Sequence, residues 1–293
     1  MADGMSHGGA EGALAHAPAP TPAAAPSPVS APTPVAGLAP ELDLREKGRA
    51  LNGQPQALDR RLFVQLLVFG GCRDPRPLVE LLEKRRVQGV LYEDLNDPAG
   101  IGLLTFDEDP AYFLETARPI VSGEVFGGLR LREELTMLGR TYSMGWEADL
   151  EEALITRPKS RLCSPELPWA VWYPLRRSGA FEELPEKEQR AVLAEHGAVG
   201  QMFGKAGAAH DIRLACHGLS KDDNDFVIGI LGAELYPLSA VVQRMRKTRQ
   251  TSRYMARLGP FFVGRALWQS RPGQTLPGPA PTGQSRLGQV RPS

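Results

Sequence analysis

The sequence has no excess charge of either sign and no long apolar run. Lys and Arg together number 34, as do Asp and Glu, in a chain of 293 residues. A net charge of zero argues against general affinity for nucleic acid or an anionic membrane, so any anion site must be local. No apolar run reaches the roughly 18 residues of a membrane span, and the N-terminal stretch lacks the basic and apolar segments of a secretory signal. We therefore expect neither nucleic acid nor a membrane as a partner.

Cysteine is scarce as well. Cys72, Cys163 and Cys216 are odd in number and far apart, which matches neither a disulfide framework nor the spacing of zinc ligands. A reducing compartment fits this usage best, so the sequence predicts a cytoplasmic protein.

Both ends of the chain have few core-forming residues. Residues 16–37, HAPAPTPAAAPSPVSAPTPVAG, and residues 270–293 are dominated by small residues and proline, a composition that cannot form a packed core. The sequence predicts disordered tails over residues 1–56 and 269–293.

Between the tails, the same order of elements is expected twice. Strand, helix, strand, strand, helix, strand are predicted over residues 61–69, 75–86, 90–97, 101–106, 109–121 and 139–149, and again over 169–177, 185–204, 211–217, 225–231, 237–250 and 260–264. Each series is a ferredoxin-like βαββαβ unit. We expect an α+β fold in which two such repeats, residues 57–150 and 151–268, pack into one barrel with helices outside.

The helix expected at residues 185–204 carries a histidine on its apolar side. Val192, His196, Val199 and Phe203 recur at intervals of four, three and four, which is the spacing of one helix face. An inward imidazole can ligate a metal or a haem iron through one nitrogen while a hydrogen bond holds the other. A core histidine bonded to a backbone carbonyl would give the same pattern, so both alternatives stay open.

Four stretches around this helix carry a family resemblance: WAVWYPLRR (169–177), DIRLACHGL (211–219), DNDFVIGIL (223–231) and TSRYMARLGPFFVG (251–264). In this order they resemble the haem-binding half of the chlorite dismutase family, which includes the peroxide-dependent coproheme decarboxylases of haem synthesis. The resemblance implies a dimeric α+β barrel and His196 as the axial iron ligand. It also implies haem b or coproheme as cofactor, hydrogen peroxide as a partner, and a homo-oligomer that is commonly pentameric.

The resemblance gives Tyr173 the sharpest role. In coproheme decarboxylases a Tyr-Pro-Met stretch supplies the redox tyrosine that abstracts hydrogen from a propionate, and Tyr173-Pro174-Leu175 matches it. Strand alternation places Trp169, Val171, Tyr173 and Leu175 on one face. A tyrosine among apolar neighbours is often simply packed there, so packing is the alternative.

Coproheme has four propionates, which need cationic or hydroxyl donors. Arg161 resembles the family's propionate-binding arginine, Arg246 matches its Met-Arg pair, and Ser252 keeps its spacing from Gly259. The alternative is that these residues belong to a solvated basic helix end.

This chain also departs from the family. Chlorite dismutases place a distal arginine thirteen residues after the proximal histidine, where this sequence has Ala209, with His210 next to it. The loop after Tyr173 is short, and residues 244–253 contain no carboxylate to bond His196. A less anionic imidazole fits a mild peroxidase-like centre better than chlorite cleavage.

Three function classes remain open. The first is a haem-dependent oxidoreductase that decarboxylates coproheme oxidatively with hydrogen peroxide. The second is a non-enzymatic haem or porphyrin binder, which Ala209 and the short loop favour. The third is a cofactor-free barrel that binds a small apolar molecule, with His196 structural. A metal cluster of His217 with Asp222, Asp223 and Asp225 is conceivable, but a charged hairpin turn explains these residues better, because their spacing matches no known site.

Overall fold

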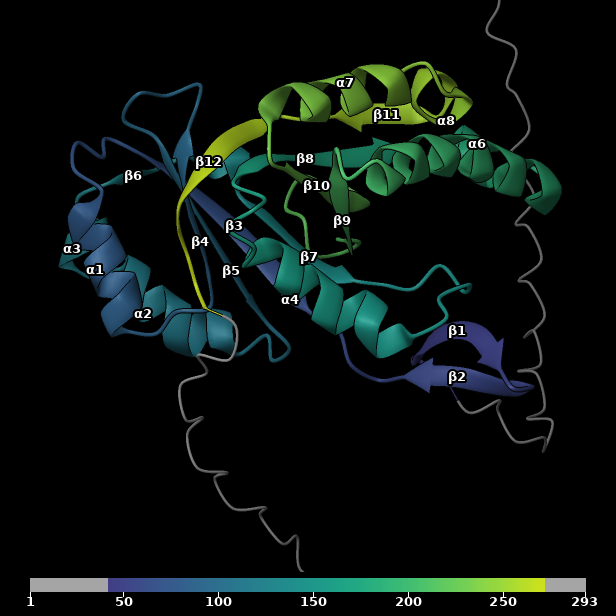
Figure 1. Ribbon diagram of the computed structural model, residues 1–293, viewed down its shortest axis with the longest axis horizontal. Coiled ribbons are helices and arrows are strands. Elements are labelled where there is room, and N and C mark those ends of the chain that lie inside the picture. Colours follow the sequence, from purple (N-terminus) through teal and green to yellow (C-terminus); the bar gives the residue numbers. More distant parts are fainter. Residues whose placement is uncertain (1–41, 272–293) are drawn as a thin grey trace, which may run out of the picture. The chain divides into compact units, whose positions relative to one another are not determined.

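The computed structural model describes residues 42–271 (Figure 1). The predicted tails lie outside these residues except at 42–56 and 269–271. A compact unit begins at Leu44, and its first element is a hairpin of β1 (Glu46–Leu51) and β2 (Gln54–Leu58). The N-terminal tail predicted over residues 1–56 therefore extends too far, because residues 46–58 form this hairpin.

A ten-stranded sheet is the central element. Its main strands are β3 (Phe63–Gly70), β4 (Gly89–Asp94), β5 (Ile101–Asp107) and β7 (Met137–Thr141) in the first repeat, and β8 (Trp169–Arg177), β9 (His210–Ala215), β10 (Phe226–Gly232) and β12 (Phe262–Gln269) in the second. Two short strands, β6 (Arg130–Leu131) and β11 (Met255–Leu258), pair with β3 and β8.

The strand order is the same in both repeats. It is β7–β3–β5–β4 in the first and β12–β8–β10–β9 in the second, with every pairing antiparallel. In addition, β4 pairs with β12 and β7 pairs with β9, which closes the sheet into a ring. This closed sheet with helices outside confirms the predicted α+β barrel.

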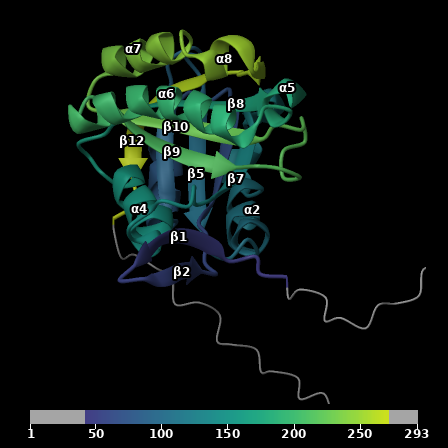
Figure 2. The ribbon, with the colours of Figure 1, turned by 90° about the vertical axis from the view of Figure 1, so that its right-hand side faces the viewer.

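The helices cover the outer face of the ring. The first repeat and the connection carry α1 (Arg76–Lys84), the π-helical turn η1 (Phe113–Ala117), α2 (Arg118–Val121), α3 (Glu124–Gly127), the 3-10 turn η2 (Glu133–Leu135), the π-helical turn η3 (Glu152–Thr156) and α4 (Arg157–Leu162). The second repeat carries α5 (Gly179–Glu182), α6 (Glu186–Lys205), α7 (Leu235–Met245) and α8 (Arg249–Arg253). Figure 2 shows α6, α7 and α8 on one side of β8, β9 and β10. None of the helices described in residues 42–271 is long and apolar enough to cross a bilayer.

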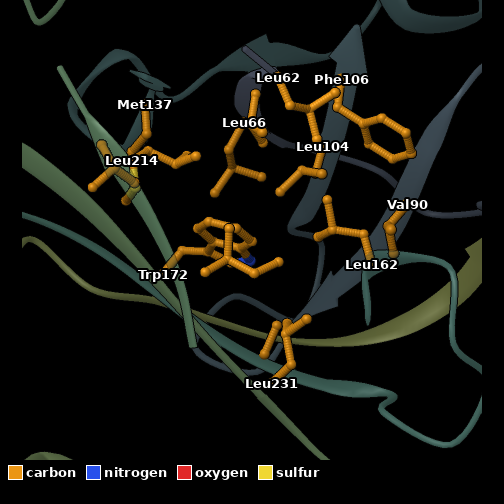
Figure 3. Close-up of a cluster of buried hydrophobic side chains, with 14 of the residues drawn as sticks. Leu62, Leu66, Val90, Leu104, Phe106, Met137, Leu162, Trp172, Leu214 and Leu231 are labelled. Atoms are coloured by element: carbon orange, nitrogen blue, oxygen red, sulfur yellow. The ribbon is translucent and has the colours of Figure 1, made fainter. Parts of the chain in front are cut away.

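The inside of the ring is a continuous apolar core (Figure 3). Trp172 is 1% exposed and is among its largest side chains. It fits because its neighbour on β10 is Gly229, where a Cβ would lie 2.4 Å from the indole ring. The glycine thus decides which side chain fills the centre of the second repeat.

The outer faces of the two repeats differ. In the first repeat, α1, α2 and α3 pack directly on the sheet through an apolar cluster that includes Leu82, Leu103 and Phe126. In the second repeat, the corresponding cluster includes Val171, Tyr173 and Leu175, as strand alternation predicts. This cluster borders a cavity, so the second repeat offers space for a ligand.

Two predicted elements end early. The strand predicted over residues 139–149 stops at Thr141, and the chain turns at Gly145 with a φ of 91°. The helix predicted over residues 237–250 stops at Met245 and resumes as α8. Both breaks border the cavity, where local hydrogen bonds replace regular structure.

Candidate functional site

A cavity of about 760 Å³ is lined by residues of α6 and α7 and by residues of β8, β9 and β10. Its volume is within the roughly 300–1,000 Å³ of common ligand sites. Four of the predicted site residues line it: Arg161, Tyr173, His196 and Arg246. The structure thus brings together side chains from α4, β8, α6 and the end of α7.

His196 is half-buried in the wall formed by α6. Its Nδ1 lies 3.0 Å from the Thr248 hydroxyl, and no other hydrogen bond to the ring occurs among the described residues. The hydrogen-bond partner of His196 is thus a side-chain hydroxyl. A purely structural core histidine was expected to bond a backbone carbonyl instead. Burial, and then the positive charge of Arg177, lower the pKa of His196 to about 4. The imidazole is therefore neutral at pH 7, the state that can ligate a metal.

Tyr173 is 7% exposed, and its side chain lies at the wall formed by β8. Its ring stacks on Phe261 at a centroid distance of 4.6 Å, while no described residue hydrogen-bonds its hydroxyl. Burial, and then the negative charge of Asp211, raise the pKa of Tyr173. The phenol therefore keeps its hydrogen at neutral pH.

The two predicted arginines reach the cavity differently. Arg161 is half-buried and donates from Nη1 to the backbone oxygen of Asp211 at 2.7 Å, and burial lowers its pKa. Arg246 is exposed at the C-terminal end of α7. Ser252 is exposed in α8 and is not part of the cavity wall. The structure does not bring it to the site.

Arg177 also lines the cavity, although it is not among the site residues predicted from the sequence. Its guanidinium lies 4.7 Å from the ring centroids of both Phe181 and Phe226. Its Nε is buried without a hydrogen-bond partner, and the exposed Glu182 is 3.9 Å from its Nη1. Continuing the alternation from Tyr173 by four residues would have placed Arg177 on the same face of β8.

Ala209 and His210 both line the cavity at the start of β9. Ala209 is 5% exposed and has no polar side-chain atom. His210 is half-buried, and burial, followed by the charge of Arg161, lowers its pKa. The position of the family's distal arginine is thus apolar, next to a neutral imidazole.

Trp146 lines the cavity from the segment between β7 and η3. It is 59% exposed and still lines the cavity, together with Met144. The strand expected over residues 139–149 would include this segment, and its spacing alone does not indicate a place in the site.

The conceivable metal cluster near His217 does not form. His217 Nε2 lies 3.7 Å from Asp225, and Asp223 pairs with Arg176 at 2.7 Å. Across residues 42–271, no group of three His, Cys, Asp or Glu side chains can hold a metal ion. All three cysteines are unpaired and buried.

Several solved structures are similar to this chain. A haem-binding protein from Thermus thermophilus is 18% identical, with a TM-score of 0.56, over 72% of this chain and 92% of that one. A chlorite dismutase mutant from Candidatus Nitrospira defluvii is 15% identical, with a TM-score of 0.56, over 71% and 92%. The enzyme from the same organism in complex with imidazole is 14% identical, with a TM-score of 0.53, over 70% and 90%. At such identities these likenesses support the fold alone.

No curated protein sequence matches the chain. The family model of chlorite dismutase matches residues 135–267. These residues include α6 and the strands that line the cavity, so the family resemblance seen in the sequence is confirmed where the candidate site lies. Over residues 135–267 the chain is thus similar to the chlorite dismutase family.

Proposed function

We propose that the protein binds an iron porphyrin through His196 and uses hydrogen peroxide to convert coproheme into haem b. The observation that carries this proposal is the neutral His196, held by one ring nitrogen, in the wall of a large and mainly apolar cavity. An imidazole held in this way is a typical axial ligand of haem iron.

The residues beside His196 fit a flat macrocycle. Gly197 and Gly200 also line the cavity. A Cβ added to Gly197 would meet no atom within 4 Å, and one added to Gly200 would meet only the flexible end of Met245. The helix backbone can therefore approach a ring that a larger side chain would keep away.

Charge supports coproheme over haem b as the substrate. Five cationic side chains line the cavity but only one carboxylate does: Arg161, Arg177, Lys205, Arg213 and Arg246 against Asp211. Asp211 already lies 3.1 Å from Nε of Arg213. Arginine binds carboxylates favourably. A surplus of cationic side chains therefore suits the four propionates of coproheme better than the two of haem b.

Each decarboxylation would convert a propionate into a vinyl group and CO₂. The two electrons released, with two protons, reduce one hydrogen peroxide to two water molecules, so the reaction consumes one peroxide and one external proton for each propionate. Bound iron porphyrin would supply the one-electron chemistry. The Tyr173 phenol, protonated and without a hydrogen-bond partner among the described residues, would give up its hydrogen and take one from the propionate.

Ala209 supports a second candidate, a haem or porphyrin binder without turnover. It leaves the matching position without a side chain that hydrogen-bonds a bound oxidant. His210 is the nearest polar neighbour on β9. Only a turnover experiment separates the two candidates.

The test is to titrate the purified protein with coproheme and with haem b, add hydrogen peroxide, and identify the porphyrin by mass. We expect tighter binding of coproheme and stepwise loss of two CO₂. His196→Ala should abolish the five-coordinate haem spectrum, whereas His217→Ala, an exposed histidine outside the cavity, should not. Loss of that spectrum in His217→Ala instead would contradict the assignment.

Tyr173→Phe separates catalysis from binding. The change removes one oxygen and keeps the ring that stacks on Phe261, so coproheme affinity should persist while product formation falls by orders of magnitude. Equal turnover in Tyr173→Phe and wild type would exclude the tyrosine mechanism. Tight binding without turnover in either protein would favour the binder.

Two further expectations belong to this proposal. Three unpaired, buried cysteines support a reducing compartment such as the cytoplasm. Assembly into a homo-oligomer stays a prediction from the family, to be measured by light scattering.

A further inference from the structure

The hydrogen bond of His196 defines its tautomer. Thr248 is 4% exposed, and its Oγ1 donates to the backbone oxygen of Met245 at 2.7 Å. A hydroxyl has one hydrogen, and this one is used at Met245. The contact of 3.0 Å between Thr248 Oγ1 and His196 Nδ1 therefore needs the hydrogen on Nδ1. The lone pair is then on Nε2, the nitrogen left for a metal.

The backbone around Thr248 is held in place by its own hydrogen bonds. Thr248 lies between α7 and α8, where its N–H donates to Met245 O at 3.0 Å and its carbonyl accepts from Ser252 N at 2.9 Å. The break between the two helices thus presents the hydroxyl to His196.

Glu195, the residue before His196, fixes this segment from the side of α6. Its carboxylate accepts from the backbone N–H of Arg249 at 3.1 Å and from Nε of Arg249 at 2.7 Å. Arg249 is the neighbour of Thr248 in sequence. His196 bonds Thr248, and the preceding residue Glu195 bonds the following residue Arg249. Hydrogen bonds at two adjacent positions therefore join α6 to the start of α8.

We propose that Thr248 is a positioning residue that fixes His196 as the Nδ1–H tautomer, and that the Glu195–Arg249 pair holds Thr248 in register. Its importance for iron binding rests on the proposed function, but the tautomer is a property of the protein without any cofactor. The carboxylate of Glu195 accepts hydrogen bonds from Arg249 and none from the imidazole. His196 therefore donates to a neutral hydroxyl, which leaves it a weaker electron donor than an imidazole bonded to a carboxylate.

The first experiment uses the cofactor-free protein. Selective ¹⁵N labelling of its five histidines lets NMR report which ring nitrogen of His196 carries the hydrogen, with His196→Ala identifying the signal. Wild type and Thr248→Ser, which keeps the hydroxyl, should both show one tautomer with hydrogen on Nδ1. Thr248→Val, of nearly the same shape, should show a substantial population with hydrogen on Nε2. An unchanged tautomer in Thr248→Val would overturn the proposal.

A matched pair tests the second link. Glu195→Ala should mix the tautomers, whereas Glu186→Ala, which removes an exposed carboxylate bonded to Arg190 on the same helix, should not. Equal spectra for these two variants would refute the role of Glu195. Circular dichroism checks that every variant is folded.

The second experiment adds haem. Loss of a hydrogen bond to a ligating histidine commonly lowers metal affinity 10–100-fold, so Thr248→Val should bind coproheme at least tenfold more weakly and Thr248→Ser within about threefold of wild type. Equal affinities would refute positioning at the iron. If the wild type binds no porphyrin, the proposed function fails while the tautomer result stands, so the two failures are distinguishable.

Discussion

Gly197→Leu should change stability and affinity in opposite directions. A glycine inside a helix costs about 0.5–1 kcal/mol relative to alanine, and leucine is nearly as good a helix former as alanine. A Cβ at Gly197 would meet no atom within 4 Å, so the new side chain starts in open space. The free energy of unfolding of the cofactor-free protein should therefore rise by about 0.5–1 kcal/mol.

The same side chain would occupy space beside His196. Gly197 lines the cavity, and a rigid porphyrin bound to the neighbouring residue cannot move aside. We expect coproheme affinity to fall at least tenfold, equivalent to about 1.4 kcal/mol. Urea unfolding measures the first effect, and titration followed at the Soret band measures the second.

Ala191→Leu is the matched control, since Ala191 is exposed in α6 and lies outside the cavity wall. It should leave affinity unchanged. If Gly197→Leu binds coproheme as tightly as the control does, the porphyrin does not approach α6 at this point. If Gly197→Leu is less stable than wild type, the cavity is smaller than the structure indicates.

Gly229→Ala should destabilise the fold by about 1–3 kcal/mol, because the new Cβ would lie 2.4 Å from the Trp172 ring; unchanged urea unfolding would contradict the tight packing. The guanidinium of Arg60 is the main cause that holds the pKa of Glu108 below its ordinary 4.5, so this carboxylate stabilises the fold above pH 4.5 and loses that effect as the pH falls. Glu108→Gln should therefore be less stable at pH 7 by at most about 1 kcal/mol, and unfolding curves should converge well below pH 4.5; a difference independent of pH would refute the ion pair's role. Chlorite degradation should be negligible because residue 209 is alanine, and rapid oxygen evolution at an oxygen electrode would disprove this.

The order of elements could be predicted because apolar periodicity is strong where strands face the core. The strand predicted over residues 169–177 matches β8, and the helix predicted over residues 185–204 differs from α6 by one residue at each end. The β1–β2 hairpin was missed because most of its residues are exposed and show no apolar alternation. Its turn, Asn52–Gly53, has φ angles of 52° and 77°, and this dipeptide was the available indicator.

The site was predicted in part for a similar reason. His196 and Tyr173 occupy regular elements, where spacing indicates which side chains face inward. Thr248 and Trp146 lie in segments between elements, and only the folded chain brings Thr248 to His196 and Trp146 to the cavity. Arg177 was missed because a charged residue at a strand end suggests solvent, yet its guanidinium lies against two aromatic rings.

During synthesis, β12 leaves the ribosome after every other strand of the ring. It pairs with β4 and with β8, so one edge of each of those strands stays open until it arrives. Open strand edges are templates for pairing with other chains. About 175 residues separate the end of β4 from the end of β12, which takes roughly 9–35 s at about 5–20 residues per second. For that period one edge of β4 is without its partner strand and is open to pairing with other chains.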